Sequence, residues 1–198
     1  MPRAHRWNPL TYLAVLAGMT AASAACQDRE RVDITAEPVA EFSKRVDEYV
    51  ALRNSLADSI GHIDETKSQE EIAARATGLA AAILSARPAA KQGDIFTPEV
   101  ASVLATLIRE EYRRRPPAVQ ETRGDTQEEL PDFVPEVNQI YPTTYPLATF
   151  PASLLPLLPK LPEQVEYRMV GRYLILRDIE ANLIVDVMPN ALPASVPT

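Results

Sequence analysis

Apolar side chains recur every three or four residues in the first part of the chain, a spacing that places them on one face of a helix. The first such stretch covers about residues 38–60, and Arg53 stands where the next apolar contact is expected, with Leu52 beside it as a substitute. Gly61 offers a left-handed stop. The apolar positions are Val39, Phe42, Val46, Tyr49, Leu56 and Ile60. This pattern predicts a first helix.

Start and stop signals frame two further helices. Residues 68–71 form a capping-box pattern, and Pro88 ends the stretch that follows. Residues 97–98, a threonine before a proline, are typical of an N-cap and a first helical turn. Pro116 forbids continuation of the third stretch. We therefore expect a helical region over residues 38–115.

The character of the chain changes over residues 116–162, which hold ten of its eighteen prolines. So many prolines exclude regular helices and central strands, yet the second half of this region is too apolar for a solvated linker. We expect an extended proline-rich arm, fixed in a groove of its own domain or bound to a partner. Its most distinctive feature is a repeated Tyr-Pro pair, which makes Tyr141 and Tyr145 candidate contacts for an envelope protein partner.

Three apolar stretches near the C-terminus, rich in β-branched and aromatic side chains, predict β-strands: residues 165–170, 172–177 and 183–188. Gly171 and residues 180–182 supply the turns. We expect a three-stranded antiparallel meander within residues 163–190. Because two of its strands are apolar on both faces, helices, arm or both should cover it. The predicted fold class is α+β, with residues 38–193 forming one domain.

The first twenty-five residues have the parts of a bacterial signal peptide: a basic start, an apolar run and small residues before Cys26. The apolar run, residues 10–19, is too short to span the roughly 30 Å core of a bilayer, which favours removal over a permanent anchor. Two cleavage reactions compete. Residues 22–24 fit ordinary signal peptidase, and residues 23–26 resemble the lipobox of bacterial lipoproteins, which usually has an aliphatic residue where this chain has Ser23.

Cys26 is the only cysteine and precedes a polar stretch, residues 27–31. A lone thiol in an oxidising compartment invites pairing between molecules, and lipidation prevents this. We therefore predict lipidation at Cys26, a polar tether over residues 26–37, and a location on the periplasmic side of a bacterial membrane. A diacylglycerol supplies the two acyl chains that stable anchoring requires. The alternative is a fortuitous cysteine beside an ordinary cleavage site.

Export changes the charge of the protein. Loss of Arg3 and Arg6 takes the formal net charge from −7 to −9. An acidic chain argues against non-specific binding of nucleic acid. Its six glycines form no phosphate-binding loop. We expect no nucleic-acid partner, no nucleotide and no cofactor.

Catalytic groups are few in the mature chain. His62 is its only histidine, and no G-x-S-x-G elbow accompanies it. His62 with Asp58, Asp64 and Glu65 offers mixed metal ligands, but zinc sites normally use more histidine or cysteine. A solvated histidine near a helix end is therefore favoured over a hydrolase or a metal centre.

Carboxylates gather again at the meander, where Asp178 and Asp186 flank the last turn. Two carboxylates across a hairpin can raise one pKa or hold a cation, although acidic residues at strand ends also form turns. These two residues and His62 are the candidate contacts for a ligand or metal.

Two segments, residues 91–98 and 166–186, resemble a family of uncharacterised exported bacterial proteins. The second contains the motifs Glu-Tyr-Arg-Met-Val-Gly-Arg and Ala-Asn-Leu-Ile-Val-Asp. The likeness spans about residues 42–193 and implies export from a bacterium, but no activity. The meander also resembles the C-terminal β unit of periplasmic nickel and cobalt homeostasis proteins in shape alone, with no metal-related residue matched.

These features predict a non-enzymatic cell-envelope protein, periplasmic or lipid-anchored, with an interaction or structural role. The alternative is a periplasmic metal- or small-ligand-binding module that uses a cleft between helices and meander. An enzyme ranks third, because carboxylates alone would have to do its acid and base work.

Overall fold

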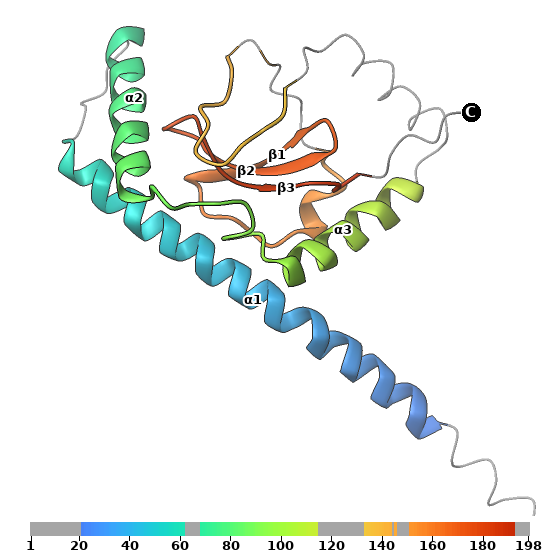
Figure 1. Ribbon diagram of the computed structural model, residues 1–198. Coiled ribbons are helices and arrows are strands. Elements are labelled where there is room, and N and C mark those ends of the chain that lie inside the picture. Colours follow the sequence, from blue (N-terminus) through green and yellow to red (C-terminus); the bar gives the residue numbers. More distant parts are fainter. Residues whose placement is uncertain (1–20, 62–67, 115–132, 144, 146–150, 193–198) are drawn as a thin grey trace, which may run out of the picture. The chain divides into compact units, whose positions relative to one another are not determined.

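The computed structural model describes residues 21–61, 68–114, 133–143, 145 and 151–192, with side chains from residue 36 onward (Figure 1). The chain forms two compact units, Met1–Glu37 and Pro38–Thr198. Three helices precede a three-stranded antiparallel sheet, which confirms the α+β class. The elements are α1 (Ala21–Ser59), α2 (Gln69–Ala86), α3 (Pro98–Arg113), the 3₁₀ turn η2 (Leu155–Leu157), β1 (Val165–Val170), β2 (Tyr173–Asp178) and β3 (Leu183–Met188).

Helix α1 begins earlier than the sequence pattern predicts. It starts at Ala21 instead of near Pro38, and residues 26–37, expected as a polar tether, lie within it. Pro38 has no amide hydrogen for the carbonyl of Ile34, so the helical hydrogen-bond ladder is interrupted there. The boundary between the two units falls directly before this proline. Among the described residues, no helix is sufficiently long and apolar to cross a membrane.

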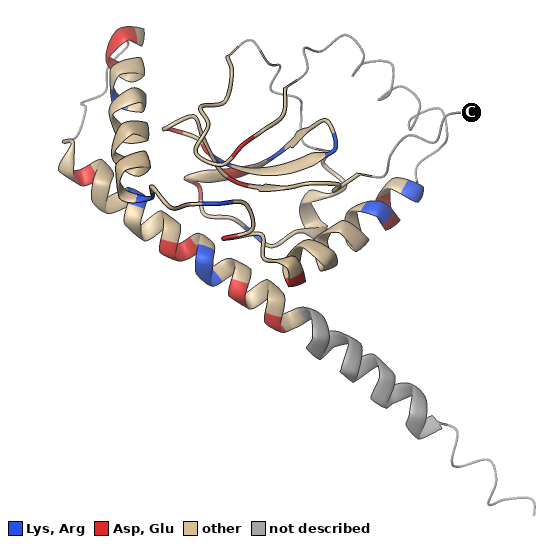
Figure 2. Cartoon of the chain, in the orientation of Figure 1, with Lys and Arg blue, Asp and Glu red and all other residues tan. Residues whose placement is uncertain are grey.

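The second half of α1 is amphipathic. Its exposed side carries charges of both signs (Figure 2), with Lys44 close to Glu41 and Glu48 at helical spacing. Such exposed pairs contribute little each, typically under about 1 kcal/mol. Its buried side holds Phe42, Val46, Tyr49, Val50, Arg53 and Ala57. The predicted stripe is confirmed at Phe42, Val46 and Tyr49. Beyond Tyr49 the buried face continues through Arg53 and Ala57, while Ile60, expected in the stripe, is 42% exposed.

Helices α2 and α3 start where the sequence predicts. The Ser68 hydroxyl accepts the Glu71 amide at 3.4 Å, and α2 ends before Pro88. Helix α3 begins directly after Thr97, whose side chain makes no capping hydrogen bond to the backbone. Each helix buries one narrow stripe, formed by Leu79, Ala80 and Ile83 in α2 and by Val100, Leu104 and Ile108 in α3.

The predicted meander is confirmed, with strand order β1-β2-β3. Val170 pairs with Tyr173, so a two-residue turn joins β1 to β2. Gly171 in that turn has a φ of 55°, a left-handed conformation that glycine adopts without a Cβ penalty. Asn182, between β2 and β3, also has a positive φ, of 51°, and asparagine tolerates this better than most residues.

Both faces of the sheet are buried, as the apolar strands predict. One face packs against the helices, where Phe42 stacks on Phe96 and Tyr167 with ring centroids 5.4 and 6.3 Å away. The other face carries a second cluster that includes Ile175 and Ile184 and is covered by residues of the arm. The sheet is therefore a middle layer, with residues 133–143 and 145 of the arm on one side and the helices on the other, where Leu154 and Leu158 of the arm join the helix-facing core.

Candidate functional site

Tyr141 and Tyr145, the candidate partner contacts, lie in the second cluster and are only 2% and 6% exposed. Their rings meet edge to face, with centroids 6.1 Å apart. The arm also pairs with the outer edge of β3, since the Tyr141 amide donates to the Asn182 carbonyl at 2.9 Å and the Ile184 amide to the Gln139 carbonyl at 2.8 Å. The described part of the arm thus packs on its own domain, and these two rings face its interior.

Asp186, a candidate ligand contact, is fully buried on β3 and accepts four backbone hydrogen bonds. Three donors belong to the loop before α3: the amides of Gly93, Ile95 and Phe96, at 2.9, 2.7 and 2.7 Å. The fourth is the amide of Val187, at 2.7 Å. Burial raises the pKa of the Asp186 carboxyl, and the four amides oppose this shift. The side chain thus binds a distant loop to the sheet.

A β-bulge gives Asp186 this orientation. Leu176 pairs with Asp186 and Arg177 pairs with Ile184, so Val185 is an extra residue on β3. An extra residue changes which face the following side chains point to. Asp186 consequently lies opposite Leu176, whose side chain belongs to the helix-facing core, and it meets the loop from that side.

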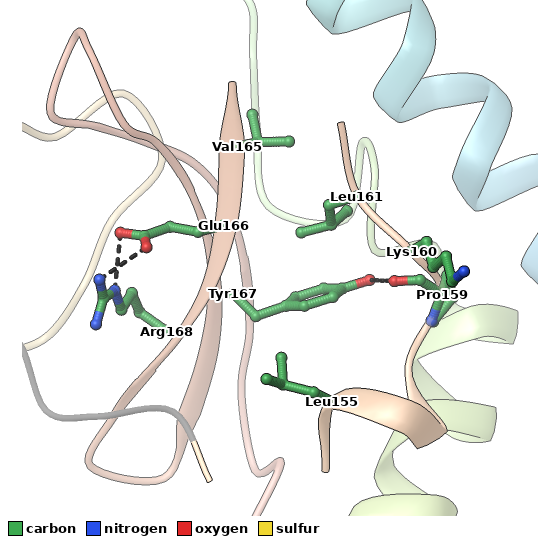
Figure 3. A pocket seen from close by; sticks show the side chains of 8 residues that line it. All are labelled: Leu155, Pro159, Lys160, Leu161, Val165, Glu166, Tyr167 and Arg168. Carbon is green, nitrogen blue, oxygen red and sulfur yellow. Dashed lines mark hydrogen bonds and ion pairs between the residues drawn. The ribbon is translucent and has the colours of Figure 1, made fainter. Parts of the chain in front are cut away.

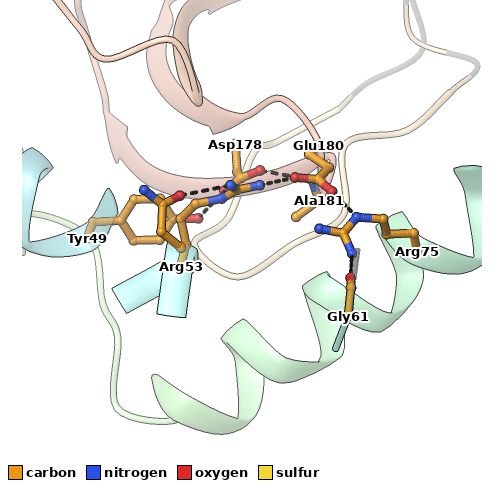
Figure 4. A network of polar contacts seen from close by, with 8 residues as sticks. Tyr49, Arg53, Gly61, Arg75, Asp178, Glu180 and Ala181 are labelled. Atoms are coloured by element: carbon orange, nitrogen blue, oxygen red, sulfur yellow. Dashed lines mark hydrogen bonds and ion pairs between the residues drawn. The ribbon is translucent and has the colours of Figure 1, made fainter. Parts of the chain in front are cut away.

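Asp178, the other meander aspartate, is fully buried at the end of β2. It accepts the Tyr49 hydroxyl at 2.8 Å, the Arg53 guanidinium at 3.2 Å and the Ala181 amide at 2.8 Å (Figure 4). Burial and the nearby Asp178 charge raise the pKa of Tyr49, which keeps its phenol protonated as a donor. Asp178 therefore closes the β2–β3 turn and joins it to α1.

Glu180 extends this network to α2. It pairs with Arg53 and, at 2.5 Å, with the Nε of Arg75, whose Nη1 donates to the Gly61 carbonyl at the end of α1 (Figure 4). Burial disfavours the charged form of Glu180, but the hydrogen bonds and charges of both arginines outweigh burial and lower its pKa. One carboxylate thus links both helices to the same turn.

The candidate ligand residues do not assemble into one metal site in the described part of the chain. Asp178 and Asp186 each serve a separate internal anchor. Asp58 is exposed on α1, and His62 with its neighbours Asp64 and Glu65 lies outside the described residues. The described ranges contain no group of three histidine, cysteine, aspartate or glutamate residues placed to hold a metal ion. Cys26 lies within α1, at a position where only the backbone is described.

A pocket of about 570 Å³ lies beside β1 (Figure 3). Turn η2 and the segment after it form one wall, and β1 forms the other. The apolar lining is Leu155, Pro159, Leu161, Val165 and the Tyr167 ring. Its charged lining is Lys160, Glu166 and Arg168. Leu155 and Leu161 lie on either side of the Tyr167 ring (Figure 3). The Tyr167 hydroxyl donates to the Pro159 carbonyl at 3.1 Å, which ties the two walls together.

The sequence did not lead us to predict two features: the burial and pairing of Arg53, and the pocket beside β1. Arg53 interrupts the apolar stripe of α1, and such an arginine is a signal for a buried acidic partner because a buried charge requires pairing. The pocket gave no comparable signal, since its wall is a proline-rich segment whose path the pattern leaves open.

No protein-family model, curated protein or solved structure matches the chain. The resemblance to uncharacterised exported proteins therefore stays a prediction.

Proposed function

We propose that this protein is a non-enzymatic component of the bacterial cell envelope, exported by its N-terminal signal and anchored by lipid at Cys26. Its folded domain serves interaction with an envelope partner or a structural role. The main support for a non-enzymatic role is that the buried charged side chains bind other groups of the same domain. Asp178, Asp186 and Arg53 are all buried, and each is engaged by groups of the domain itself. Acids held in this way stabilise a rigid domain and are poorly placed for acid or base work on a substrate.

The anchor rests on the sequence before the domain. Small residues precede the single cysteine, and polar residues follow it. The division of the chain before Pro38 supports a separate N-terminal unit in front of a folded one. Anchored in this way, the domain meets its partners at the membrane surface.

Fractionation of a bacterium that expresses the tagged protein tests this function. We expect the wild type in the membrane fraction and accessible from the periplasmic side, whereas Cys26→Ser is not retained as a lipid-anchored protein. Ser23→Leu is the matched variant, since it moves the lipobox towards the usual aliphatic residue and should increase the processed, membrane-bound form. Equal membrane retention of the wild type and Cys26→Ser would contradict the anchor.

We propose binding of a small ligand as a second function, favoured by the pocket beside β1. Pockets of about 300–1,000 Å³ with apolar walls and few polar groups are typical of ligand sites. The lining contains one carboxylate, Glu166, and four aliphatic or proline side chains. This composition favours an organic ligand over a metal ion.

A further inference from the structure

The pocket beside β1 offers an apolar surface that solvent can reach. Leu155 is 54% exposed at its rim, while Val165 and Tyr167 at its base are only 4% and 6% exposed. Leu161 faces the same space (Figure 3). An alkyl chain laid against these groups would remove apolar surface from water, which is the main favourable contribution to binding of such chains.

The polar groups of the pocket differ in their engagement. Glu166 and Arg168 form a two-point ion pair, at 2.7 and 2.8 Å, and Glu166 also pairs with Arg177. The Tyr167 hydroxyl is engaged by the Pro159 carbonyl. Within the described part of the chain, the ammonium of Lys160 has neither an ion pair nor a hydrogen bond, and the residue is exposed at the pocket. The uncompensated charge of the lining is therefore a single positive one.

We propose that this pocket binds a single-chain amphiphile with an anionic head, the chemical class of a long-chain fatty acid. The alkyl chain lies against Leu155, Leu161 and the Tyr167 ring, and the carboxylate meets Lys160. Charge complementarity selects the head, since a cationic head would face Lys160 without a partner, and the aliphatic walls select the chain. This inference rests on the second proposed function and is independent of the anchor at Cys26.

Titration of the mature chain, residues 26–198 with Cys26→Ser, tests the inference by calorimetry and by NMR shifts of the pocket amides. The probes are dodecanoate, dodecyltrimethylammonium and acetate, each below its micelle concentration. We expect dodecanoate to bind, acetate to cause no shift because it lacks the chain, and the cationic probe to bind at least about tenfold more weakly.

Matched variants separate the pocket from general surface effects. Leu155→Asp should weaken dodecanoate binding at least about tenfold. The matched control is Ile72→Asp on α2, which should leave binding unchanged, because Ile72 has the same number of side-chain carbons as leucine and a similar exposure of 55%. Lys160→Glu should reverse the preference between the anionic and the cationic probe, and Lys91→Glu should not. Because all four positions are exposed, the variants should fold.

Three results would overturn the inference: no dodecanoate binding, equal binding by Leu155→Asp and Ile72→Asp, or equal binding of both charged probes by the wild type. In the last case, shifts confined to the pocket would keep the second proposed function and remove only the anionic class. Lack of response to every probe would remove the amphiphile as the ligand of this pocket, while the fractionation of Cys26→Ser would test the lipid-anchored function independently.

Discussion

Replacement of Asp186 by asparagine tests how the sheet holds the loop before α3. One carboxylate oxygen accepts the amides of Ile95 and Phe96, and the other accepts those of Gly93 and Val187. Asparagine has the same shape but a single acceptor oxygen. If that oxygen keeps the amides of Ile95 and Phe96, the side-chain NH₂ group faces the amides of Gly93 and Val187. These two amides then face another hydrogen-bond donor and lose their acceptor.

The expected loss of stability follows from these two amides. A buried donor without a partner costs about 1–3 kcal/mol. The Val187 bond is buried and the Gly93 bond is partly buried, so Gly93 regains some hydration. Relief of the buried charge, which raises the pKa of Asp186, offsets part of the cost. We expect Asp186→Asn to lower the free energy of unfolding by about 3 kcal/mol.

Urea unfolding of the mature chain, followed by circular dichroism, measures this loss. The matched control is Asp94→Asn in the same loop, where the carboxylate accepts one exposed hydrogen bond, from the Lys91 amide at 2.9 Å. This control should change the free energy by less than about 0.5 kcal/mol. A loss below about 1 kcal/mol for Asp186→Asn would refute the anchoring role given to the carboxylate.

Three further results are expected. Arg53→Met should destabilise the domain by about 3–5 kcal/mol in the same urea assay, because Asp178 then keeps a buried charge without its cation, and a loss below about 1 kcal/mol would count against the network. The lowered pKa of Glu180 gives stability that is present above its ordinary pKa of 4.5 and is lost as the pH falls through the folded-state pKa. Arg75→Gln should reduce this acid dependence, and an unchanged pH profile would contradict the link between Arg75 and Glu180. Tyr141→Ala should cost about 3 kcal/mol because its ring is buried, whereas a stability equal to the wild type would mean that the arm does not pack on the sheet.

Local signals in the sequence predicted most of the elements. Ser68 marks the start of α2 through its hydroxyl, and Pro88 marks its end because proline has no amide hydrogen. The apolar stretches on either side of Gly171 mark a hairpin. Such signals act within a few residues, so one sequence reveals them. The start of α1 was predicted too late because the apolar spacing begins only near Pro38, whereas the helix continues on the N-terminal side of that proline.

Long-range polar contacts could not be predicted in the same way. Asp186 was expected to flank the last turn as a candidate contact for a ligand or metal, but it lies within β3. The bulge at Val185 turns it towards a loop some ninety residues earlier in the chain. Arg53 was interpreted as an interruption of the stripe. Its partners, Asp178 and Glu180, belong to the C-terminal part of the domain's sequence. The residue types were visible in the sequence, but their partners depend on the fold.

The position of the proline-rich arm also could not be predicted from the sequence. The notable feature was a pair of tyrosines in a proline-rich segment, which suits either a partner or the protein's own sheet. Tyr141 and Tyr145 form an apolar cluster with Phe133, and the Tyr141 amide pairs beside β3. Whether the arm packs on its own sheet or binds a partner depends on whether the sheet leaves an apolar face and a strand edge uncovered. The amino-acid composition does not reveal this.

The intact mass of the protein isolated from bacterial membranes tests the proposed anchor most directly. We predict a chain that begins at Cys26 and carries the added mass of a diacylglycerol, while the Cys26→Ser protein carries no lipid. An unmodified mature chain that begins at another residue, or a full-length chain that still begins at Met1, would contradict the lipid-anchored function.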